Sequence, residues 1–353
     1  MQSALIYAIN PVEPIESYLD SVCHEGIFLL TDSNVERELL PIFSSLIAKY
    51  DIKVIVVEAG EVNKNLKSLS YVWQQLSDLG AGRLSILLNL GGGVVTDMGG
   101  FAAATFKRGI RYINIPTTIL GAADAAVGGK TAIDFNGLKN EIGAFYKPEK
   151  IVFAQNLFKT LPEKEKLSGF AEIVKMAMIS SGDIYRMILK GEFSPFSESL
   201  FTPLRFAIEE KMRITEIDPT EKGERKLLNF GHTAGHAFES LMVEKGLPVT
   251  HGEAVAHGIL VALILSRMVK GFPADDIYIY AQEILKRYYK PLPISCKDCD
   301  RLIEFSIHDK KNINRSEINF VLLCGIGEPQ RDVAVSPSMV RSALDIYLDI
   351  LGR

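Results

Sequence analysis

Short apolar runs alternate with longer amphipathic segments through the first 160 residues of the chain. The apolar runs are rich in β-branched residues and cover 26–31, 52–57, 84–90 and 110–115, which predicts buried strands. Segments 34–49 and 66–79 lie between these runs and have helical patterns. Because strands that alternate with helices form parallel sheets covered on both faces, we expect an α/β, Rossmann-like domain over residues 1–160.

The pattern changes near residue 161, where strand-like runs become rare. Helical patterns cover 163–181, 203–217, 227–244, 252–269, 274–289 and 337–351, and one strand-like segment lies at 318–323. We therefore expect a second, mostly α-helical domain over residues 161–353. A chain of 353 residues is also long for a single hydrophobic core, which favours two domains.

The stretch 84–106 joins an apolar run to three glycines and an Ala-rich helical segment. Gly91, Gly92 and Gly93 end the run, and Asp97 follows four residues later. A buried strand, a glycine turn and a helix N-terminus form a cradle for phosphate, because the glycines admit the ligand and the helix end offers N–H groups. Three consecutive glycines are not the G-x-G-x-x-G fingerprint, so an ordinary strand-to-helix turn is the alternative.

Polar residues follow the carboxyl ends of the other expected strands. They are Asp32, then Glu61 with Lys64, then Thr117 with Thr118. Ligands bind at the carboxyl ends of parallel strands, so these loops together predict a nucleotide crevice. Asp32 suits either a ribose hydroxyl pair or the cap of the next helix. Glu61 and Lys64 alone are more typical of a solvated ion pair.

Three of the six histidines fall within twenty residues, at His232, His236 and His251. The first two share one helix face, and imidazole is a common ligand of zinc and similar ions. Glu172 lies in an otherwise apolar helical segment, where a carboxylate is costly without a partner, so it is the candidate third ligand. The alternatives are satisfied core histidines and a surface glutamate beside Lys175.

Composition excludes some classes of partner. The net charge of −4 gives no general attraction to nucleic acid or to an anionic membrane. We expect a cytoplasmic protein, because the N-terminus has no secretion signal and the apolar stretches are too short or too Gly-interrupted to span a bilayer. Cys296 and Cys299 form a lone C-x-x-C without a second pair, which favours exposed, inert thiols over a metal or redox site.

Several lysine and arginine residues, spread along the chain, could together line one pocket for a multiply charged substrate. Taken singly, each of them is more typical of a solvated surface charge. These residues are Lys130, Lys139, Lys175, Lys211, Arg225, Lys310 and Lys311.

Several motifs, in order along the chain, match one known family. The chain resembles the 3-dehydroquinate synthases, the shikimate-pathway members of the sugar phosphate cyclases. The resemblance runs from TDSN at residue 31 to DKK at residues 309–311. It is carried by GGGVVTDMGGF, RGIRYINIPTT, AADAAVGGKTAID, GLKNEIGAFYKP, LFKTLP, GFAEIVK, LLNFGHTAGHAFE and HGEAVAHG.

This resemblance implies an N-terminal NAD-binding domain and a C-terminal helical domain with a divalent metal, usually zinc. One glutamate and two histidines would also accept cobalt. It implies conversion of 3-deoxy-D-arabino-heptulosonate 7-phosphate to 3-dehydroquinate and phosphate. NAD would oxidise a metal-held alcohol transiently, phosphate would be eliminated, the hydride would return, and an intramolecular aldol reaction would close the ring. A homodimer is implied as well.

The resemblance also implies roles for individual residues. The metal ligands would be Glu172, His232 and His251, and His236 would contact substrate and handle a proton. The NAD contacts would be Asp32, Glu61, Lys64, Gly91, Gly92, Gly93, Val94, Val95, Asp97, Thr117, Thr118, Lys139 and Thr160. The substrate pocket would contain Asp124, Lys130, Asn140, Lys175, Lys211, Arg225, Asn229 and one of Lys310 or Lys311, with Arg108 reaching the phosphate across the dimer interface.

The sequence departs from the common family pattern without losing a proposed metal ligand. The departures are Thr96, Ala125, Ala126, Glu141 and Gln155. Alternatives are a valiolone- or inosose-type cyclase, a metal-dependent glycerol or alcohol dehydrogenase, and a nucleotide-binding regulator. Retention of Lys211, Arg225, Asn229 and Asn140 favours dehydroquinate among the cyclases, and glutamate at the first ligand disfavours the dehydrogenases.

Overall fold

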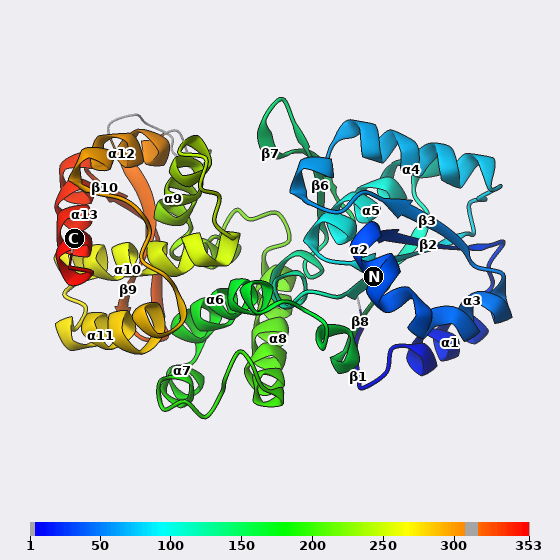
Figure 1. Ribbon diagram of the computed structural model, residues 1–353, viewed down its shortest axis with the longest axis horizontal. Helices are drawn as coiled ribbons and strands as arrows, with labels where there is room; N and C mark the ends of the chain where they lie inside the picture. Colours follow the sequence, from blue (N-terminus) through cyan, green and yellow to red (C-terminus); the bar gives the residue numbers. More distant parts are fainter. Residues whose placement is uncertain (1–3, 308–316, 353) are drawn as a thin grey trace. The chain divides into compact units, whose positions relative to one another are not determined.

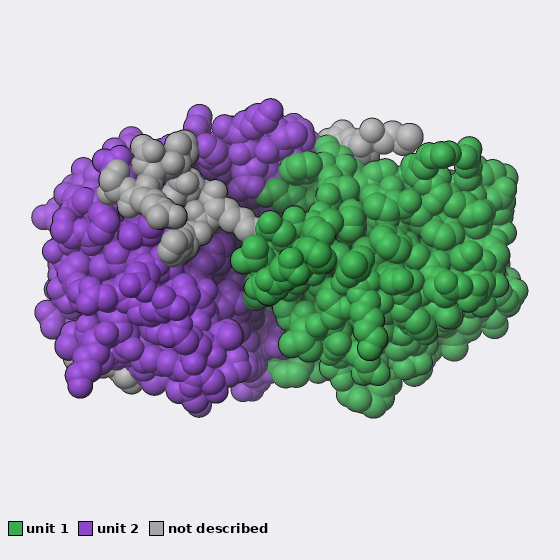
Figure 2. Space-filling model, turned by 90° about the horizontal axis from the view of Figure 1, so that it is seen from above, with its two compact units in different colours: residues 1–162 green, residues 163–353 purple. Residues whose placement is uncertain are grey.

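The computed structural model describes residues 4–307 and 317–352. The chain divides into two compact units, residues 1–162 and 163–353, which Figure 2 draws in green and purple. The first unit contains a parallel α/β sheet, and the second is mostly helical, so the predicted fold class is confirmed.

The first unit is built on a six-stranded sheet with the order β1-β8-β5-β4-β2-β3. All of its pairings are parallel. The four predicted strands are confirmed as β2 (Ile27–Asp32), β3 (Lys53–Val57), β4 (Ile86–Gly91) and β5 (Arg111–Pro116). The sequence did not predict β1 (Ala4–Ala8) and β8 (Lys150–Ala154), which extend the sheet beyond β5.

Helices cover both faces of this sheet, as the buried central strands require. Ile86, Leu88 and Leu90 of β4 face the core beneath α1 (Val12–Ser21), α2 (Ser33–Leu39) and α3 (Ser44–Tyr50). Leu87 faces the opposite core, beneath α4 (Leu66–Asp78) and α5 (Gly93–Thr105). The single helix expected at 34–49 is interrupted by a 3₁₀ turn, Leu40–Phe43, whose proline cannot donate an α-helical hydrogen bond.

Smaller elements complete the first unit. An antiparallel hairpin of β6 (Lys130–Phe135) and β7 (Leu138–Phe145) packs against α5 through β6. A π-helical turn, η4 (Gly121–Ala125), follows β5. Besides η1 (Leu40–Phe43), this unit has 3₁₀ turns at η2 (Glu61–Asn63), η3 (Phe106–Arg108) and η5 (Gln155–Phe158).

The second unit is organised around α10 (His251–Lys270), which packs against other helices and a hairpin (Figure 1). The other helices are α6 (Glu163–Ser180), α7 (Gly182–Leu189), α8 (Phe201–Ile217), α9 (His232–Glu244), α11 (Ala274–Ile279), the π-helix η8 (Tyr280–Lys286), α12 (Cys299–Ile307) and α13 (Pro337–Ile350). Short 3₁₀ turns lie at η6 (Glu198–Leu200), η7 (Glu224–Asn229) and η9 (Cys296–Asp298).

Helix α10 corrects one expectation, because it is long and apolar enough to cross a membrane by length and composition. However, 78% of its most apolar window is buried inside the protein, where it contacts α6, α9, α13 and β9. It is therefore the core helix of the second unit.

The predicted strand at 318–323 is confirmed as β9 (Ile318–Gly325), which pairs antiparallel with β10 (Glu328–Val335). The sequence did not predict β10, because half of its residues EPQRDVAV are charged or polar, most of them are exposed, and its second residue is Pro329, which is uncommon inside a strand. The helix expected at 227–244 begins only at His232, after Gly231 in a left-handed conformation with φ 76°.

Candidate functional site

The glycine turn of the first unit connects β4 to α5 as the sequence predicted. Gly91 ends the strand, Gly92 precedes the helix, and Gly93 begins it. A Cβ atom on Gly92 would lie only 3.0 Å from the Thr118 side chain, so a larger residue would crowd the turn. The Thr96 hydroxyl lies 3.3 and 3.2 Å from the carbonyl oxygens of Gly92 and Gly93, so this departure from the family pattern ties the first helical turn together.

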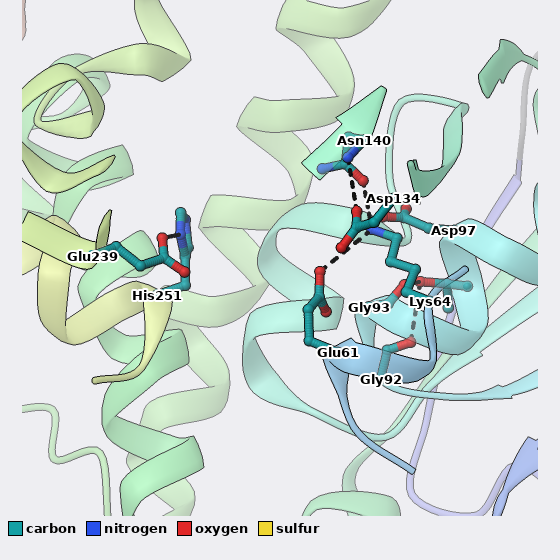
Figure 3. Close-up of polar contacts among 10 residues, drawn as sticks. Glu61, Lys64, Gly92, Gly93, Asp97, Asp134, Asn140, Glu239 and His251 are labelled. Carbon is teal, nitrogen blue, oxygen red and sulfur yellow. Dashed lines mark hydrogen bonds and ion pairs between the residues drawn. The ribbon is translucent and has the colours of Figure 1, made fainter. Parts of the chain in front are cut away.

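Lys64 is buried next to this turn, with only 3% of its surface exposed. Its Nζ lies 2.5 Å from Asp97 Oδ2, 2.6 Å from Asn140 Oδ1 and 3.9 Å from Glu61 Oε1 (Figure 3). Burial works to lower the pKa of Lys64, but Asp97 and Glu61 outweigh it and raise the pKa, so the ammonium is retained. The interpretation of Glu61 and Lys64 as a solvated pair is therefore wrong for Lys64.

The same network contains Asn140, which the family resemblance assigns to the substrate rather than to NAD. Asn140 has φ 52°, a left-handed conformation that asparagine tolerates. Its backbone N–H donates to Asp134 Oδ1 at 2.8 Å, and the Asp134 N–H donates to the Lys64 carbonyl at 2.8 Å. The hairpin is thus attached to the loop after β3, which brings two predicted groups of residues together.

Two further sequence candidates have structural partners at the sheet edge. The Asp32 carboxylate caps α2 by accepting the N–H groups of Asn34 and Val35 at 2.9 and 3.1 Å, so the capping alternative is confirmed. The Thr117 N–H donates to the Gly91 carbonyl at 3.0 Å, which fixes the end of β5 beside the glycine turn. Lys139 and Thr160 are exposed, Val94 is half-buried, and Val95 is buried.

In the second unit, three helices bring Glu172, His232 and His251 together. Glu172 lies within α6, and the two histidines are the first residues of α9 and α10. Their ligand atoms all lie within 4.8 Å of one another. Glu172 Oε1 is 3.5 Å from His232 Nε2 and 3.8 Å from His251 Nε2. The sequence prediction of this cluster agrees with the geometry.

The two oxygens of Glu172 have different surroundings. Glu172 is 3% exposed, and its Oε2 forms an ion pair with Lys175, which is 1% exposed, so the surface alternative is wrong. Its Oε1 is buried and has no hydrogen-bond partner among the described residues. A buried carboxylate oxygen without a partner is costly, and two imidazole nitrogens face it. This donor set fits a divalent cation.

Both imidazoles are oriented by a hydrogen bond on the nitrogen that faces away from Glu172. His232 Nδ1 lies 3.2 Å from the Phe230 carbonyl oxygen, which can only accept, so Nδ1 carries the proton. His251 Nδ1 lies 3.3 Å from Glu239 Oε2. Each Nε2 is thereby left with a lone pair for a metal. The His236 ring centroid is 5.4 Å from that of His232 and 5.9 Å from that of His251.

Glycines set how closely the three helices approach, a feature the sequence reasoning missed. A Cβ atom on Gly252 would lie 1.9 Å from the Ser168 carbonyl oxygen, and one on Gly258 would lie 2.1 Å from the Gly231 carbonyl oxygen. The Gly252 N–H also donates to Ser168 Oγ at 3.1 Å. The available signal was the glycine next to each ligand histidine, Gly231 before His232 and Gly252 after His251.

The predicted basic residues divide into buried and exposed sets. Lys175, Lys211 and Arg225 are 1%, 6% and 3% exposed, so the interpretation as solvated charges is wrong for them. They lie on α6, α8 and η7, which pack against one another. Arg108, Lys130 and Asn140 are exposed, and Asp124, Asn229 and His236 are partly exposed. Lys310 and Lys311 lie outside the described residues.

Acidic side chains organise the segment that carries Arg225 and Asn229. Asp218 accepts the N–H groups of Lys222, Gly223 and Arg225 at 3.0, 2.6 and 3.1 Å. Desolvation works to raise the pKa of Asp218, but these donors outweigh it and lower the pKa. The Asn229 amide donates to Glu221 Oε1 at 2.9 Å. The segment is therefore held in one conformation.

The cysteines form no further candidate site. Cys296 is exposed as expected, but Cys299 is buried, and burial raises the pKa of its thiol. In the part of the chain that the structure describes, the only cluster of potential metal ligands is Glu172, His232 and His251.

Comparisons with known proteins identify the family to which the chain is similar. The N-terminal 3-dehydroquinate synthase family model matches residues 54–168, and the C-terminal model matches residues 169–312. A 3-dehydroquinate synthase of Parabacteroides distasonis is 44% identical over 339 residues, covering 96% of both chains.

Solved structures of other cyclases share the fold. A 2-deoxy-scyllo-inosose synthase complexed with carbaglucose-6-phosphate, NAD⁺ and Co²⁺ is 25% identical, with a TM-score of 0.85 and coverage of 96% of this chain and 95% of that chain. A 2-epi-5-epi-valiolone synthase from Streptomyces hygroscopicus is 20% identical with a TM-score of 0.85, covering 99% and 97% of the two chains.

Proposed function

The chain belongs to the 3-dehydroquinate synthase family, and on that premise we propose how its two units divide the work. The enzyme is a phosphate-eliminating cyclase of the shikimate pathway that converts 3-deoxy-D-arabino-heptulosonate 7-phosphate to 3-dehydroquinate and phosphate. We assign NAD binding to residues 1–160, and metal and substrate binding to residues 161–353. Family models that match both halves support this reaction over the dehydrogenase and regulator alternatives.

The NAD site is assigned to the glycine turn and the loops beside it. The α5 N-terminus after Gly92 suits a pyrophosphate, since the first N–H groups of a helix lack partners within the helix. Lys64 and Asp97 are held in a buried network that suits ribose hydroxyls. The inosose synthase complex with NAD⁺ supports the assignment. When bound, NAD supplies a hydride acceptor that becomes the donor later in the same turnover.

The metal site is assigned to Glu172 Oε1, His232 Nε2 and His251 Nε2. The observation that carries it is the buried Oε1, which faces two imidazole nitrogens and has no hydrogen-bond partner among the described residues. Two nitrogens and one carboxylate oxygen suit zinc, and cobalt fits the same set. When bound, such a cation polarises substrate hydroxyls and makes one of them more acidic.

Most of the cationic and polar residues assigned to the substrate lie in residues 161–353. Lys211 and Arg225 lie on elements packed against α6, and their buried charges suit a phosphate and a carboxylate. Lys175 keeps one oxygen of Glu172 neutralised as well. His236 lies one helical turn after His232, where it can hold or move a substrate proton. Asp124, Lys130, Asn140, Asn229 and one of Lys310 or Lys311 complete the assigned set.

One assay tests the reaction and the cofactor roles. Purified protein is supplied with the heptulosonate phosphate and substoichiometric NAD, and phosphate release is followed together with absorbance of NADH. We expect many phosphates per NAD and no net NADH, because the hydride returns to the substrate. Stoichiometric NADH with glycerol and no phosphate release would instead assign the chain to the dehydrogenases.

We assign the protein to a cytoplasmic homodimer in which Arg108 serves the partner's site. The family resemblance and the free cysteines support this assignment. A mixture of Arg108→Ala and Glu172→Gln chains tests it, because a mixed dimer would contain one site with both intact residues. We expect activity to recover on mixing and subunit exchange. Two inactive parents that stay inactive as a mixed dimer, or a monomer by sedimentation, would contradict the assignment.

A further inference from the structure

Glu239 has no role in the chemistry proposed above, yet it lies beside one of the candidate ligands. It occupies the same stripe of α9 as His232 and His236, at positions i, i+4 and i+7. Its Oε2 lies 3.3 Å from His251 Nδ1, as Figure 3 shows. The Glu239 side chain is 14% exposed and the His251 side chain 25% exposed, so the contact is partly shielded from water.

We propose that Glu239 is a positioning residue that fixes the proton on His251 Nδ1 and thereby aims His251 Nε2 at Glu172 Oε1. A carboxylate accepts the Nδ1 proton, so the lone pair of the ring is on Nε2, the atom that would bind a cation. The same ring has its Nε2 3.8 Å from Glu172 Oε1. The inference rests on the proposed metal site and extends it by one residue outside the ligand set.

The two histidines need different support. His232 is oriented by the carbonyl of Phe230, two residues earlier in its own chain segment. His251 instead depends on a side chain from another helix, α9, for its Nδ1 contact. Because an ionised carboxylate is a stronger acceptor than a carbonyl, Glu239 also makes the His251 ring a better electron donor.

The distance between Glu239 and His251 is set by close packing of α9 and α10. A Cβ atom on Gly235 would lie 3.1 Å from the Val255 Cα and 3.3 Å from the Ala254 carbonyl oxygen. Glycine at 235, one turn before Glu239, therefore lets the two helices approach. The Thr250 hydroxyl accepts the Glu253 N–H at 3.2 Å and fixes the start of α10, where His251 lies.

Glu239 acts on the His251 ring and not on the cation. Its oxygen lies next to Nδ1, whereas the atoms that converge on one point are Glu172 Oε1 and the two Nε2 atoms. Among the described residues, Glu239 does not belong to that ligand cluster. A positioning residue and a metal ligand predict different effects of substitution on the Co²⁺ absorption spectrum and on the metal affinity, so an experiment can distinguish the two roles.

The test compares Co²⁺ and Zn²⁺ dissociation constants of the full chain by competition with a chromophoric chelator. We expect about 10-fold weaker binding for Glu239→Gln, which keeps an acceptor but loses the charge, and about 100-fold for Glu239→Ala. Glu239→Asp is expected to recover part of the affinity. Glu244→Gln, on the same helix as Glu239, is the matched control, because it removes an exposed ion pair with Arg301. This variant should bind Co²⁺ and Zn²⁺ with the affinity of the parent.

Three results would overturn the inference. Unchanged affinity in Glu239→Ala would show that His251 needs no such support. A loss equal to that of His251→Ala, with a Co²⁺ absorption spectrum of altered coordination, would make Glu239 a ligand. If the parent and His251→Ala bind Co²⁺ equally weakly, the metal assignment fails, and this inference fails with it. Unfolding curves of the metal-free variants show whether any loss arises from misfolding instead.

Discussion

Each unit buries a lysine against a carboxylate, but the two pairs are completed differently. In the first unit, Lys64 reaches both Asp97 and Asn140, so its charge is balanced within the chain. In the second unit, Lys175 balances only one oxygen of Glu172, while the other faces two imidazoles without a hydrogen-bond partner among the described residues. The first arrangement is complete within the chain, and the second has the donor set of a cation site.

Glu172→Gln breaks the second arrangement and has the largest expected effect. The neutral amide cannot supply the anionic ligand, so bound metal should be lost and turnover should fall about 1000-fold, given the several kcal/mol that a Lewis acid contributes. Metal content by elemental analysis and phosphate release check this. Retained metal with normal turnover would remove Glu172 from the ligand set.

Lys64→Met and Lys175→Met sharpen the comparison as a pair. Each leaves a carboxylate whose side chain is at most 15% exposed without its cation, which costs about 3–5 kcal/mol. In thermal unfolding, Zn²⁺ should raise the melting temperature of Lys175→Met by more than it raises that of the parent. The reason is that the metal replaces the positive charge lost beside Glu172. Zn²⁺ should raise the melting temperature of Lys64→Met by no more than it raises that of the parent. Equal responses of the two variants would mean that the pairs do not differ as described.

Gly252→Ala perturbs the second unit through its backbone. The new Cβ would meet the Ser168 carbonyl oxygen, so α10 must shift away from α6, at a cost of about 1–3 kcal/mol. Metal affinity should fall with stability, since His251 moves with the helix. Gly325→Ala is the control, because its Cβ would meet only the flexible Glu328 side chain at 3.3 Å. Parent-like stability and affinity in Gly252→Ala would show that the helices need no such contact.

Asp218→Asn has the smallest expected effect and depends on pH. The folded-state pKa of Asp218 lies below its ordinary value, so its contribution to stability is present above that ordinary value and is lost as pH falls through the lower folded-state pKa. The variant should therefore be less stable than the parent at pH 7, and the difference should shrink in acid. Unfolding midpoints across this range check the sign, and a difference that grows in acid would contradict it.

The sheet core and most helices of both units were predictable from local pattern. Continuous apolar runs identified β2 to β5, and helical periodicity identified α6, α8, α10 and α13 within a few residues. The strands β1 and β8, on the side of the sheet beyond β5, were not predicted, because a short apolar run does not by itself distinguish a strand from part of a buried helix. The strand β10 could not be predicted from its own residues and is identified only by its pairing with β9.

The sequence predicted the candidate ligands of the site but not the contacts that hold them in place. The two-histidine spacing and the carboxylate in an apolar helix pointed to Glu172, His232 and His251 because residue type and helical period are local properties. The contacts of Glu239 with His251, of Lys64 with Asn140 and of Gly252 with Ser168 join residues that lie 12, 76 and 84 positions apart. Local periodicity carries no information on such pairs.

Residue order thus dictated which groups could bind a nucleotide and a cation, since donor chemistry and helix or strand propensity reside in short segments. The packing of the helices determines which oxygen of Glu172 faces the imidazoles and which nitrogen of each ring holds its proton. It also determines which lysines are buried. These choices depend on close contact between distant segments, where a single methyl group on a glycine would change the spacing.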